Sequence, residues 1–351
     1  MNIKNYIKSE ISKKLDIQLF ANNPNTNVTT QTGIGQDLSP EMKEFWDTQL
    51  LENAREGLYH TQFGKKTNLP KGNGKRAEWR KANTFAPSLT PLTEGVTPDG
   101  EKFGVTSIYA DIEQYGQYAV ISDVLEMTAY DPIIDLCNVE MGAAGSLTAD
   151  LLCRNELVKN PNVIFAPKSD GTKVEKRQDL DGTCELTPRV INKAQTILKK
   201  NKTPKINGSY VGLIHPSIAM DLRETQAWID SHKYAAVKEI FNGEIGDLHG
   251  VRFIETDNEK VWKGTANNCP TGYSVYATLI MGKDAYGIID PEGMGMEMIV
   301  KGKGSSGVSD ALNQRSSVGY KFSTATKMLY LERLIRIESV SPTFEDDDET
   351  N

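Results

Sequence analysis

The chain has 351 residues, enough for one large domain or for two to three lobes with a real core, and its 38% hydrophobic and 25% charged content suits a soluble globular protein. A formal net charge of −7 argues against a protein that clamps nucleic acid, because such proteins usually carry a basic excess that neutralises phosphates. If DNA is nearby, we expect the chain to contain it rather than grip it. No run approaches the ~20 apolar residues that span a bilayer, so we expect no membrane partner.

The first 58 residues are predicted to form an arm. Apolar residues recur there at spacings of three and four, which predicts a short amphipathic helix: Ile3, Tyr6, Ile7, Ile11 and Leu15. Residues 22–36 are rich in Asn, Thr and Gly and predict an extended, mobile segment. A second helix is expected over residues 40–58, with Ser39 as its cap.

Residues 64–118 have a different character. Their first part is basic, with only Glu78 opposing Lys65, Lys66, Lys71, Lys75, Arg76, Arg80 and Lys81. Glycines and prolines then keep the chain from being helical, and residues 105–121 are rich in Thr, Ile, Tyr and Val, which predicts a strand. We interpret the whole segment as a long two-stranded excursion with a Pro/Gly-rich connection. An isolated hairpin is only marginally stable in water, so a neighbour is expected to stabilise this one.

Residues 131–159 are the clearest predicted helix, about 40 Å long at 1.5 Å per residue. Pro132 suits the first turn, and Asn160 followed by Pro161 ends the helix. Its apolar stripe has helical spacing and comprises Ile133, Leu136, Cys137, Ala144, Leu147, Leu151 and Val158.

The remainder is predicted to alternate short strands and helices. Residues 162–182 suit a loop, and a helix begins at Thr187 and Pro188. A strand over 210–214 leads through His215 and Pro216 into another helix. Further strands are expected at 251–255, 274–281, 295–301, 316–324 and 327–340, and residues 345–349 are expected to be a solvated acidic tail. The fold class is therefore α+β with lobes that are not sequential in the chain.

The sequence lacks the patterns of common catalytic and metal sites. A P-loop fails at both Gly74-Lys75 and Gly302-Lys303, and no G-x-S-x-G, HExxH or EF-hand pattern occurs. The cysteines lie far apart and suit buried apolar positions: Cys137, Cys153, Cys184 and Cys269. We therefore predict no catalytic residue, no cofactor and no metal.

Two local features could still carry another function. His215 lies at a strand-to-helix corner, where a packed histidine is the common outcome; a hydrolase using His215 and a nearby acid is the alternative. In residues 65–81 and just beyond, cations alternate with aromatics, a pattern that suits either single-stranded nucleic acid or an acidic neighbouring copy. We favour the neighbour. The candidate subunit-contact residues are Lys65, Lys66, Lys75, Arg76, Trp79, Arg80, Lys81 and Phe85.

Residues 210–256 resemble a known family. They read Y-V-G-L-I-H-P-S-I-A-M-D-L-R, then Trp228, then K-Y-A-A-V-K-E-I-F-N-G-E-I-G-D-L-H-G-V-R-F-I-E-T. This combination is similar to the major capsid proteins of tailed phages typified by coliphage N-four, which share the Hong Kong 97-like capsid fold. I-Q-L-F-A at 17–21 and P-L-T-E-G at 91–95 resemble the same proteins, so the resemblance covers about residues 17–340.

The resemblance implies a division of the chain and a structural, non-enzymatic role. The implied parts are an N-terminal arm (1–58), an extended loop (59–120), a peripheral domain with a spine helix (121–186), an axial domain (187–316), return strands (317–342) and an acidic tail (343–351). The implied subunit assembles with itself through pentamers and hexamers into the icosahedral head around double-stranded DNA. Scaffolding, portal and decoration proteins are further candidate partners. The virion, and the host cytoplasm during assembly, are the implied locations. Deleting residues 65–97 is then expected to leave a folded protein that cannot assemble.

Overall fold

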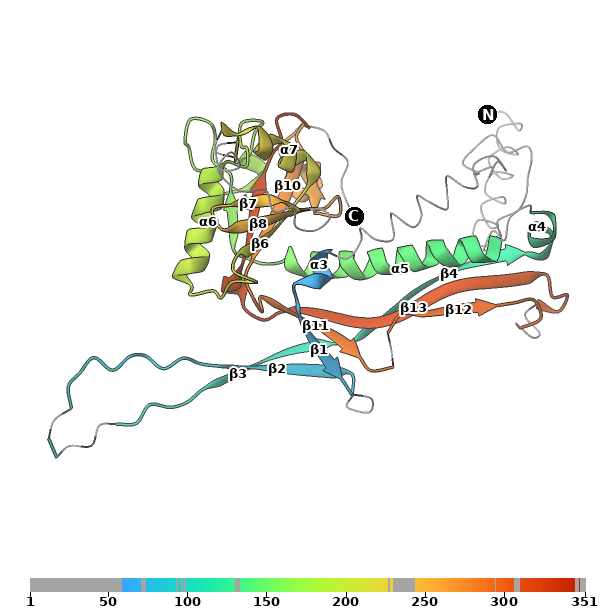
Figure 1. The fold of residues 1–351 in the computed structure, drawn as a ribbon, viewed down its shortest axis with the longest axis horizontal. Coiled ribbons are helices and arrows are strands. Elements are labelled where there is room, and N and C mark those ends of the chain that lie inside the picture. The colour runs from blue at the N-terminus through green and yellow to red at the C-terminus, as the bar shows by residue number, and fades with distance from the viewer. Residues whose placement is uncertain are drawn as a thin grey trace, which may run out of the picture. The chain divides into compact units, whose positions relative to one another are not determined.

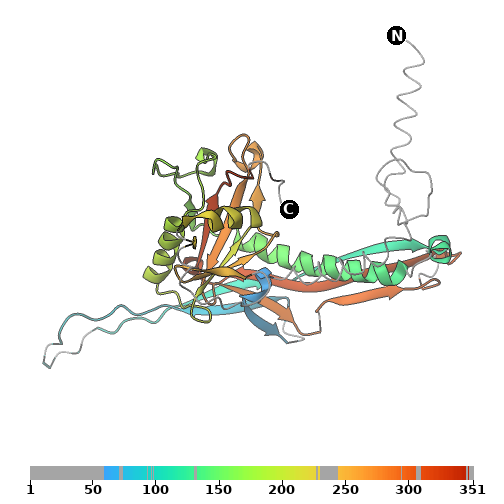
Figure 2. The same cartoon turned by 45° about the horizontal axis from the view of Figure 1, so that its top comes forward.

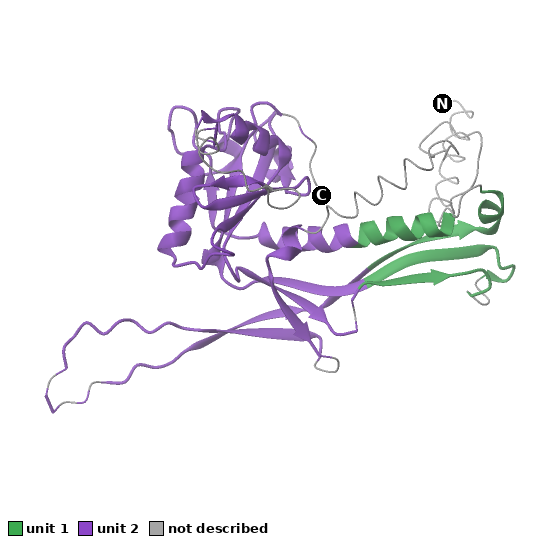
Figure 3. Ribbon diagram, in the orientation of Figure 1, with its two compact units in different colours: residues 1–53, 116–145, 296–321 green, residues 54–115, 146–295, 322–351 purple. Residues whose placement is uncertain are grey.

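The computed structural model describes residues 59–70, 74–129 except 93, 96 and 98, 133–229 except 227, 244–305 except 294, 310–344, and 347. The predicted arm lies outside these residues. The chain divides into two compact units, one of Met1–Asn53, Gly116–Gly145 and Met296–Lys321, the other of Ala54–Tyr115, Ser146–Gly295 and Phe322–Asn351 (Figure 3). Helix α5 (Ile133–Leu157) and strand β13 (Arg315–Met328) contribute residues to both.

A seven-stranded mixed sheet forms the core of the second unit, with the strand order β5-β14-β10-β6-β8-β7 and β9 added beside β10. The strands are β5 (Val163–Phe165), β6 (Tyr210–Ile214), β7 (Glu244–Leu248), β8 (Val251–Glu255), β9 (Val261–Trp262), β10 (Val275–Met281) and β14 (Leu334–Ser339). Every residue of β6 and β10 is buried. A continuous apolar run of this kind belongs to a strand covered on both faces.

Two helices pack against this sheet, α6 (Pro188–Lys200) and α7 (Pro216–Glu224) (Figures 1 and 2). Val190, Ile191 and Leu198 of α6 lie in one apolar cluster with Ile218 of α7 and Phe253 of β8. Pro188 occupies the first turn of α6, and Lys199 and Lys200 the last, where cations complement the helix dipole. These helices and β6 confirm the sequence prediction for residues 187–224.

The second sheet is built around the 14-residue strand β13 and has the order β1-β11-β13-β12, with β4 also paired to β13. Its other strands are β1 (Lys65–Leu69), β4 (Glu113–Ser122), β11 (Tyr286–Pro291) and β12 (Glu297–Lys301). In the first unit, β4 and β13 approach closely at two glycines. A Cβ on Gly319 would lie 2.6 Å from the carbonyl oxygen of Gln117, and one on Gly116 would lie 2.6 Å from that of Tyr320. Any larger residue at either position would push the strands apart.

Helix α5 confirms the long helix predicted at 131–159, of which residues 131 and 132 are not described. Its C-terminal part buries Cys153 and Leu157 against Leu279 of β10 and Leu334 of β14. In the first unit, Gly145 lets Met296 and Tyr320 approach the helix, since a Cβ there would lie 2.9 Å from the methionine methyl group. The same unit contains the short helix α4 (Asp123–Thr128), whose cap Ser122 accepts a hydrogen bond from the Leu125 amide.

Several predicted boundaries are wrong. The strand predicted over 105–121 is two strands, β3 (Val105–Asp111) and β4, because Ile112 leaves the ladder and its amide donates to the Lys75 carbonyl. The break expected at residues 325–326 is absent, since Ala325 and Thr326 pair with Ile289 and Ile288 of β11. Strands β5, β7 and β11 were not predicted, and Cys137 is half-buried rather than buried.

The predicted excursion is also shorter than residues 64–118. Strand β1 pairs in parallel with β11 inside the second sheet, so only β2 (Arg76–Ala82), β3 and their connection form the hairpin. The predicted solvated tail is corrected at Asp347, which is half-buried and hydrogen-bonded within the second unit. Residues 345, 346 and 348–351 lie outside the described part of the chain.

Candidate functional site

The β2–β3 hairpin ends in a long exposed loop. The strands pair antiparallel from Arg76 opposite Asp111 to Ala82 opposite Val105, and the Asn83 amide donates to the Gly104 carbonyl at 2.9 Å. Beyond this point, every described residue from 84 to 103 is exposed. Figure 1 shows this segment as the long connection between β2 and β3. We call residues 84–103 the hairpin loop.

The hairpin loop carries large apolar side chains that face solvent. Phe85 is 50% exposed, Phe103 61%, Leu92 76% and Leu89 89%. Phe85 and Phe103 lie near the two ends of the loop, and their ring centroids are 5.7 Å apart. The two rings therefore pack together at the base of the loop. Several large exposed apolar side chains on one loop are typical of a surface that binds another molecule. Of these residues, only Phe85 was predicted from the sequence as a contact residue. Large apolar residues in a polar, Pro-rich segment could have indicated the others.

Trp79, predicted as a subunit contact, is instead part of the subunit's own core. It is 9% exposed and packs with Ile289 of β11 and with Ala325 and Leu329. Its indole Nε1 donates to Thr67 Oγ1 at 3.1 Å, and a Cβ on Gly287 would lie 2.8 Å from its ring. The tryptophan therefore anchors the hairpin to the second sheet and is not free to contact a neighbour.

The predicted basic residues do not form one cationic patch. Arg76 makes a bidentate pair with Asp111 across the hairpin, at 2.7 and 3.1 Å. Arg80 pairs with Glu78, at 3.3 Å. Lys81 pairs with Glu332 at 2.8 Å and lies over the Tyr330 ring. The remaining predicted cations are exposed, with Lys65 and Lys66 on β1 and Lys75 just before β2. Carboxylates of the same subunit thus neutralise three of the predicted contact cations, which weakens the nucleic-acid interpretation.

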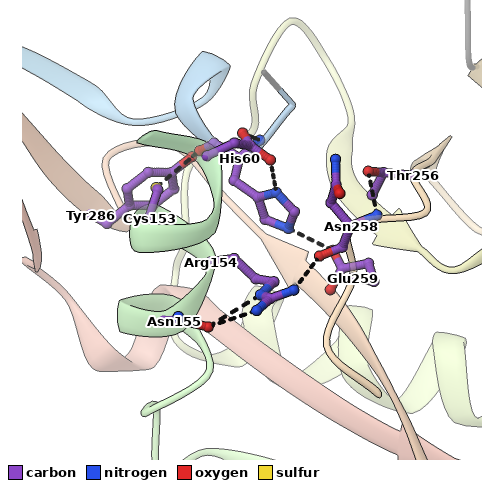
Figure 4. Close-up of polar contacts among 9 residues, drawn as sticks. His60, Cys153, Arg154, Asn155, Thr256, Asn258, Glu259 and Tyr286 are labelled. Atoms are coloured by element: carbon purple, nitrogen blue, oxygen red, sulfur yellow. Dashed lines mark hydrogen bonds and ion pairs between the residues drawn. The ribbon is translucent and has the colours of Figure 1, made fainter. Parts of the chain in front are cut away.

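A buried charge cluster that sequence analysis missed joins three distant segments (Figure 4). His60, in helix α3 (Tyr59–Gln62), places its Nδ1 2.6 Å from Asp150 Oδ2 and its Nε2 3.1 Å from Glu259 Oε1. The His60 amide also donates to Asp150 Oδ1, at 2.8 Å. Arg154 lies beside them and donates from Nη1 to the Asn258 carbonyl at 2.8 Å. All four charged side chains belong to fully buried residues.

The cluster holds His60 in its charged form. Burial alone would lower its pKa, but Glu259 and Asp150 raise the pKa of His60 to about 9. Both ring nitrogens then donate to carboxylates, so neither has a lone pair to accept a proton at neutral pH. The neighbouring Cys153 donates its thiol to the His60 carbonyl at 3.3 Å, and burial raises the pKa of that thiol. This arrangement fixes chain segments and offers no activated nucleophile.

His215 has the packed role predicted for a strand-to-helix corner. Its Nδ1 accepts the Ser217 amide hydrogen at 3.3 Å and so caps helix α7, while Ser217 Oγ donates to Asp347 at 2.7 Å. No serine–histidine pair for nucleophilic catalysis forms there, so the geometry does not support the hydrolase alternative. Within the described residues, no group of three or more His, Cys, Asp or Glu could hold a metal ion. A membrane-spanning helix is likewise absent from this part of the chain.

Comparison with known proteins gives matches in structure but not in sequence. No protein-family model matches the chain, and no curated protein sequence does. The capsid protein of cyanophage Pam1 matches with a TM-score of 0.62 and 10% identity over 92% of this chain and 99% of the other. The capsid protein of cyanophage P-SCSP1u matches with a TM-score of 0.59 and 15% identity, over 89% of this chain and 93% of the other. The capsid of Ralstonia phage GP4 matches with a TM-score of 0.58 and 13% identity, over 94% of this chain and 100% of the other. The chain therefore has the fold of phage capsid proteins along nearly its whole length.

The two aromatic residues of the hairpin should respond oppositely to truncation. Trp79→Ala should lower the free energy of unfolding by about 3–5 kcal/mol, because it opens a cavity under the hairpin. Phe85→Ala should lower it by no more than about 1 kcal/mol, because the side chain is half-exposed and its aromatic partner Phe103 is exposed as well. Chemical denaturation of both variants checks this. Equal losses of stability would contradict the division between an anchoring and a presenting residue.

The His60 cluster predicts a loss of stability at alkaline pH. The pKa of His60 is raised from 6.5 to about 9 on folding, so its contribution is complete below pH 6.5 and is lost as pH rises toward 9. The loss should be on the order of 3 kcal/mol in the free energy of unfolding. Denaturation at pH 6.5 and pH 9 should show it in the wild type and equally in the control His249→Gln, whose histidine is exposed. A wild-type stability that is flat across this range would refute the assignment.

Proposed function

We propose that the chain is the major capsid protein of a tailed phage, a structural and non-enzymatic subunit of the coliphage N-four type with the Hong Kong 97-like fold. One observation carries the proposal. The hairpin loop exposes large apolar side chains, in a chain that has the fold of phage capsid proteins. Such a loop is unfavourable on a free subunit and becomes favourable when a second copy covers it.

We assign the parts of the chain as the resemblance implies. Residues 1–58 are the N-terminal arm, 59–120 the extended-loop region, 121–186 the peripheral domain with α5 as its spine helix, and 187–316 the axial domain. Residues 317–342 supply the return strands, and 343–351 the tail. Within the extended-loop region, the hairpin β2–β3 and its loop are the element that reaches a neighbour, and β1 belongs to the sheet beneath it.

Assembly follows from repetition of this contact. An apolar side chain contributes about 1.5–3 kcal/mol when it is fully buried. Association costs a comparable total in lost freedom, so the contact made by Phe85, Leu89, Leu92 and Phe103 is weak alone and strong when repeated. The loop of one subunit covers a different surface on the next, and such heterologous contacts close into pentamers and hexamers and then into a shell. Exposed Lys65, Lys66 and Lys75 add charge complementarity to an acidic neighbour.

The shell would enclose double-stranded DNA without sequence-specific binding. The chain's net charge of −7 and the internal pairing of Arg76, Arg80 and Lys81 support containment over tight binding. Assembly in the host cytoplasm, with scaffolding, portal or decoration proteins as further partners, belongs to the same proposal.

The proposal is tested by removing the hairpin loop alone. Deleting residues 65–97 is unsuitable, because it would remove β1 and Trp79 and so unfold the second unit. Replacing residues 84–103 with Asn-Gly keeps the β2–β3 pairing and closes it with a favoured two-residue turn. We expect a folded subunit with unchanged thermal unfolding that forms no shells by electron microscopy or light scattering.

A matched control separates loop length from loop chemistry. Replacing residues 84–103 with a Gly/Ser segment of equal length removes the apolar side chains but keeps the reach, and it should also prevent assembly. Normal shells from the Asn-Gly variant would contradict the proposed role of the loop. Normal shells from the Gly/Ser variant alone would contradict the role of its apolar side chains.

A further inference from the structure

Asp347 of the C-terminal tail contacts a group of buried hydroxyls within the second unit. Asp347 Oδ2 accepts hydrogen bonds from Ser217 Oγ and from Tyr276 Oη, both at 2.7 Å. The backbone carbonyl of Asp347 accepts a third from Ser274 Oγ, also at 2.7 Å. The donors come from the first turn of α7, from β10 and from the residue just before β10. Helix α7, strand β10 and the residue that precedes β10 thus converge on one residue of the tail.

These hydroxyls form a built site. With the tail in place, Ser274 and Tyr276 are 0% exposed and Ser217 is 7% exposed. Tyr276 Oη also lies 2.9 Å from the Phe344 carbonyl, and Thr343 Oγ1 donates to Asp221 Oδ1 at 2.8 Å. The tail is therefore held at residues 343–344 as well as at Asp347. We call Ser217, Ser274 and Tyr276 the tail site.

The electrostatics of the tail site favour a carboxylate. The carboxylate lies at the N-terminal turn of α7, where the amide groups of a helix carry partial positive charge. Burial and the neighbouring Asp347 raise the pKa of Tyr276, so its hydroxyl stays protonated and can donate. The ring of His215, which caps α7, lies 5.1 Å from the Tyr276 ring. Burial lowers the pKa of His215, so its ring is neutral near pH 7 and adds no positive charge beside Asp347.

We propose that the tail site is a binding site for an acidic peptide, and that the chain's own C-terminal tail occupies it. Asp347 is the recognition residue, and Thr343 and Phe344 add contacts that set the direction of the peptide. Hydroxyl donors can be rehydrated at moderate cost when the peptide leaves, whereas an unpaired buried cation could not. The tail follows β14, the last strand, so its release breaks no strand pairing. This inference does not depend on the proposed function.

The test uses the full chain carrying Asp347→Ala, which vacates the carboxylate position. A fluorescent peptide with the sequence of residues 341–351 is titrated into this variant, and fluorescence anisotropy is measured. We expect saturable binding. A peptide with the Asp347→Ala change should bind at least about tenfold more weakly, because it loses two hydrogen bonds to a charged group. A peptide with the Asp348→Ala change loses the same charge and is the matched control, expected to bind like the unmodified one.

Two further measurements complete the test. Adding Tyr276→Phe to the Asp347→Ala chain keeps the ring but removes one donor, and it should weaken the unmodified peptide while leaving thermal unfolding unchanged. The wild-type chain should bind the peptide more weakly than the Asp347→Ala chain, because its tethered tail competes at millimolar effective concentration. Absence of binding to a folded Asp347→Ala chain would overturn the proposal. Equal affinity of the unmodified peptide and the Asp347→Ala peptide would also overturn it, by showing that the carboxylate is not recognised.

Discussion

The packing of Trp79 against the second sheet is the contact on which the hairpin depends. A two-stranded hairpin buries too little to be stable alone, and here the indole fills the space that Gly287 leaves on β11 and lies beside Leu329. This contact fixes the paired part of the hairpin, from Arg76 to Ala82, to the body of its unit. The loop beyond Gly104 and Asn83 then needs no packing of its own. Its apolar side chains remain exposed, and we propose that another copy covers them.

Internal polar contacts hold the rest of the second unit in a comparable way. The cluster of His60, Asp150, Arg154 and Glu259 joins positions that are 90 to 199 residues apart, and its charges are matched only while His60 is protonated. Arg177 and Glu338 make a similar bidentate pair, with both distances 2.7 Å and the glutamate fully buried. Removing one partner of such a pair would leave a buried charge uncompensated. These groups stabilise one arrangement of the chain.

The sequence predicted elements whose signals are local. Helices α5 and α6 and strand β6 follow from apolar spacing, Pro132 or Pro188 near a first turn, and a continuous apolar run. It could not predict features that arise from distant pairing. Strand β13 continues through Ala325 and Thr326 because β11 lies beside it, and β11 itself was not recognised. Trp79 shows the same limit at the site. Its position among cations suggested an exposed contact residue, but the space that accommodates its ring is left by Gly287, which is distant in the sequence.

We propose that the hairpin loop of one subunit is buried by another copy. An electron cryo-microscopy structure of particles assembled from this chain would show this contact directly. We expect closed shells in which residues 84–103 lie on a neighbouring subunit. Phe85, Leu89 and Leu92, which are exposed in the free chain, should be buried there. Shells in which this loop still faces solvent, or a protein that never assembles under any condition of concentration or scaffold, would contradict it.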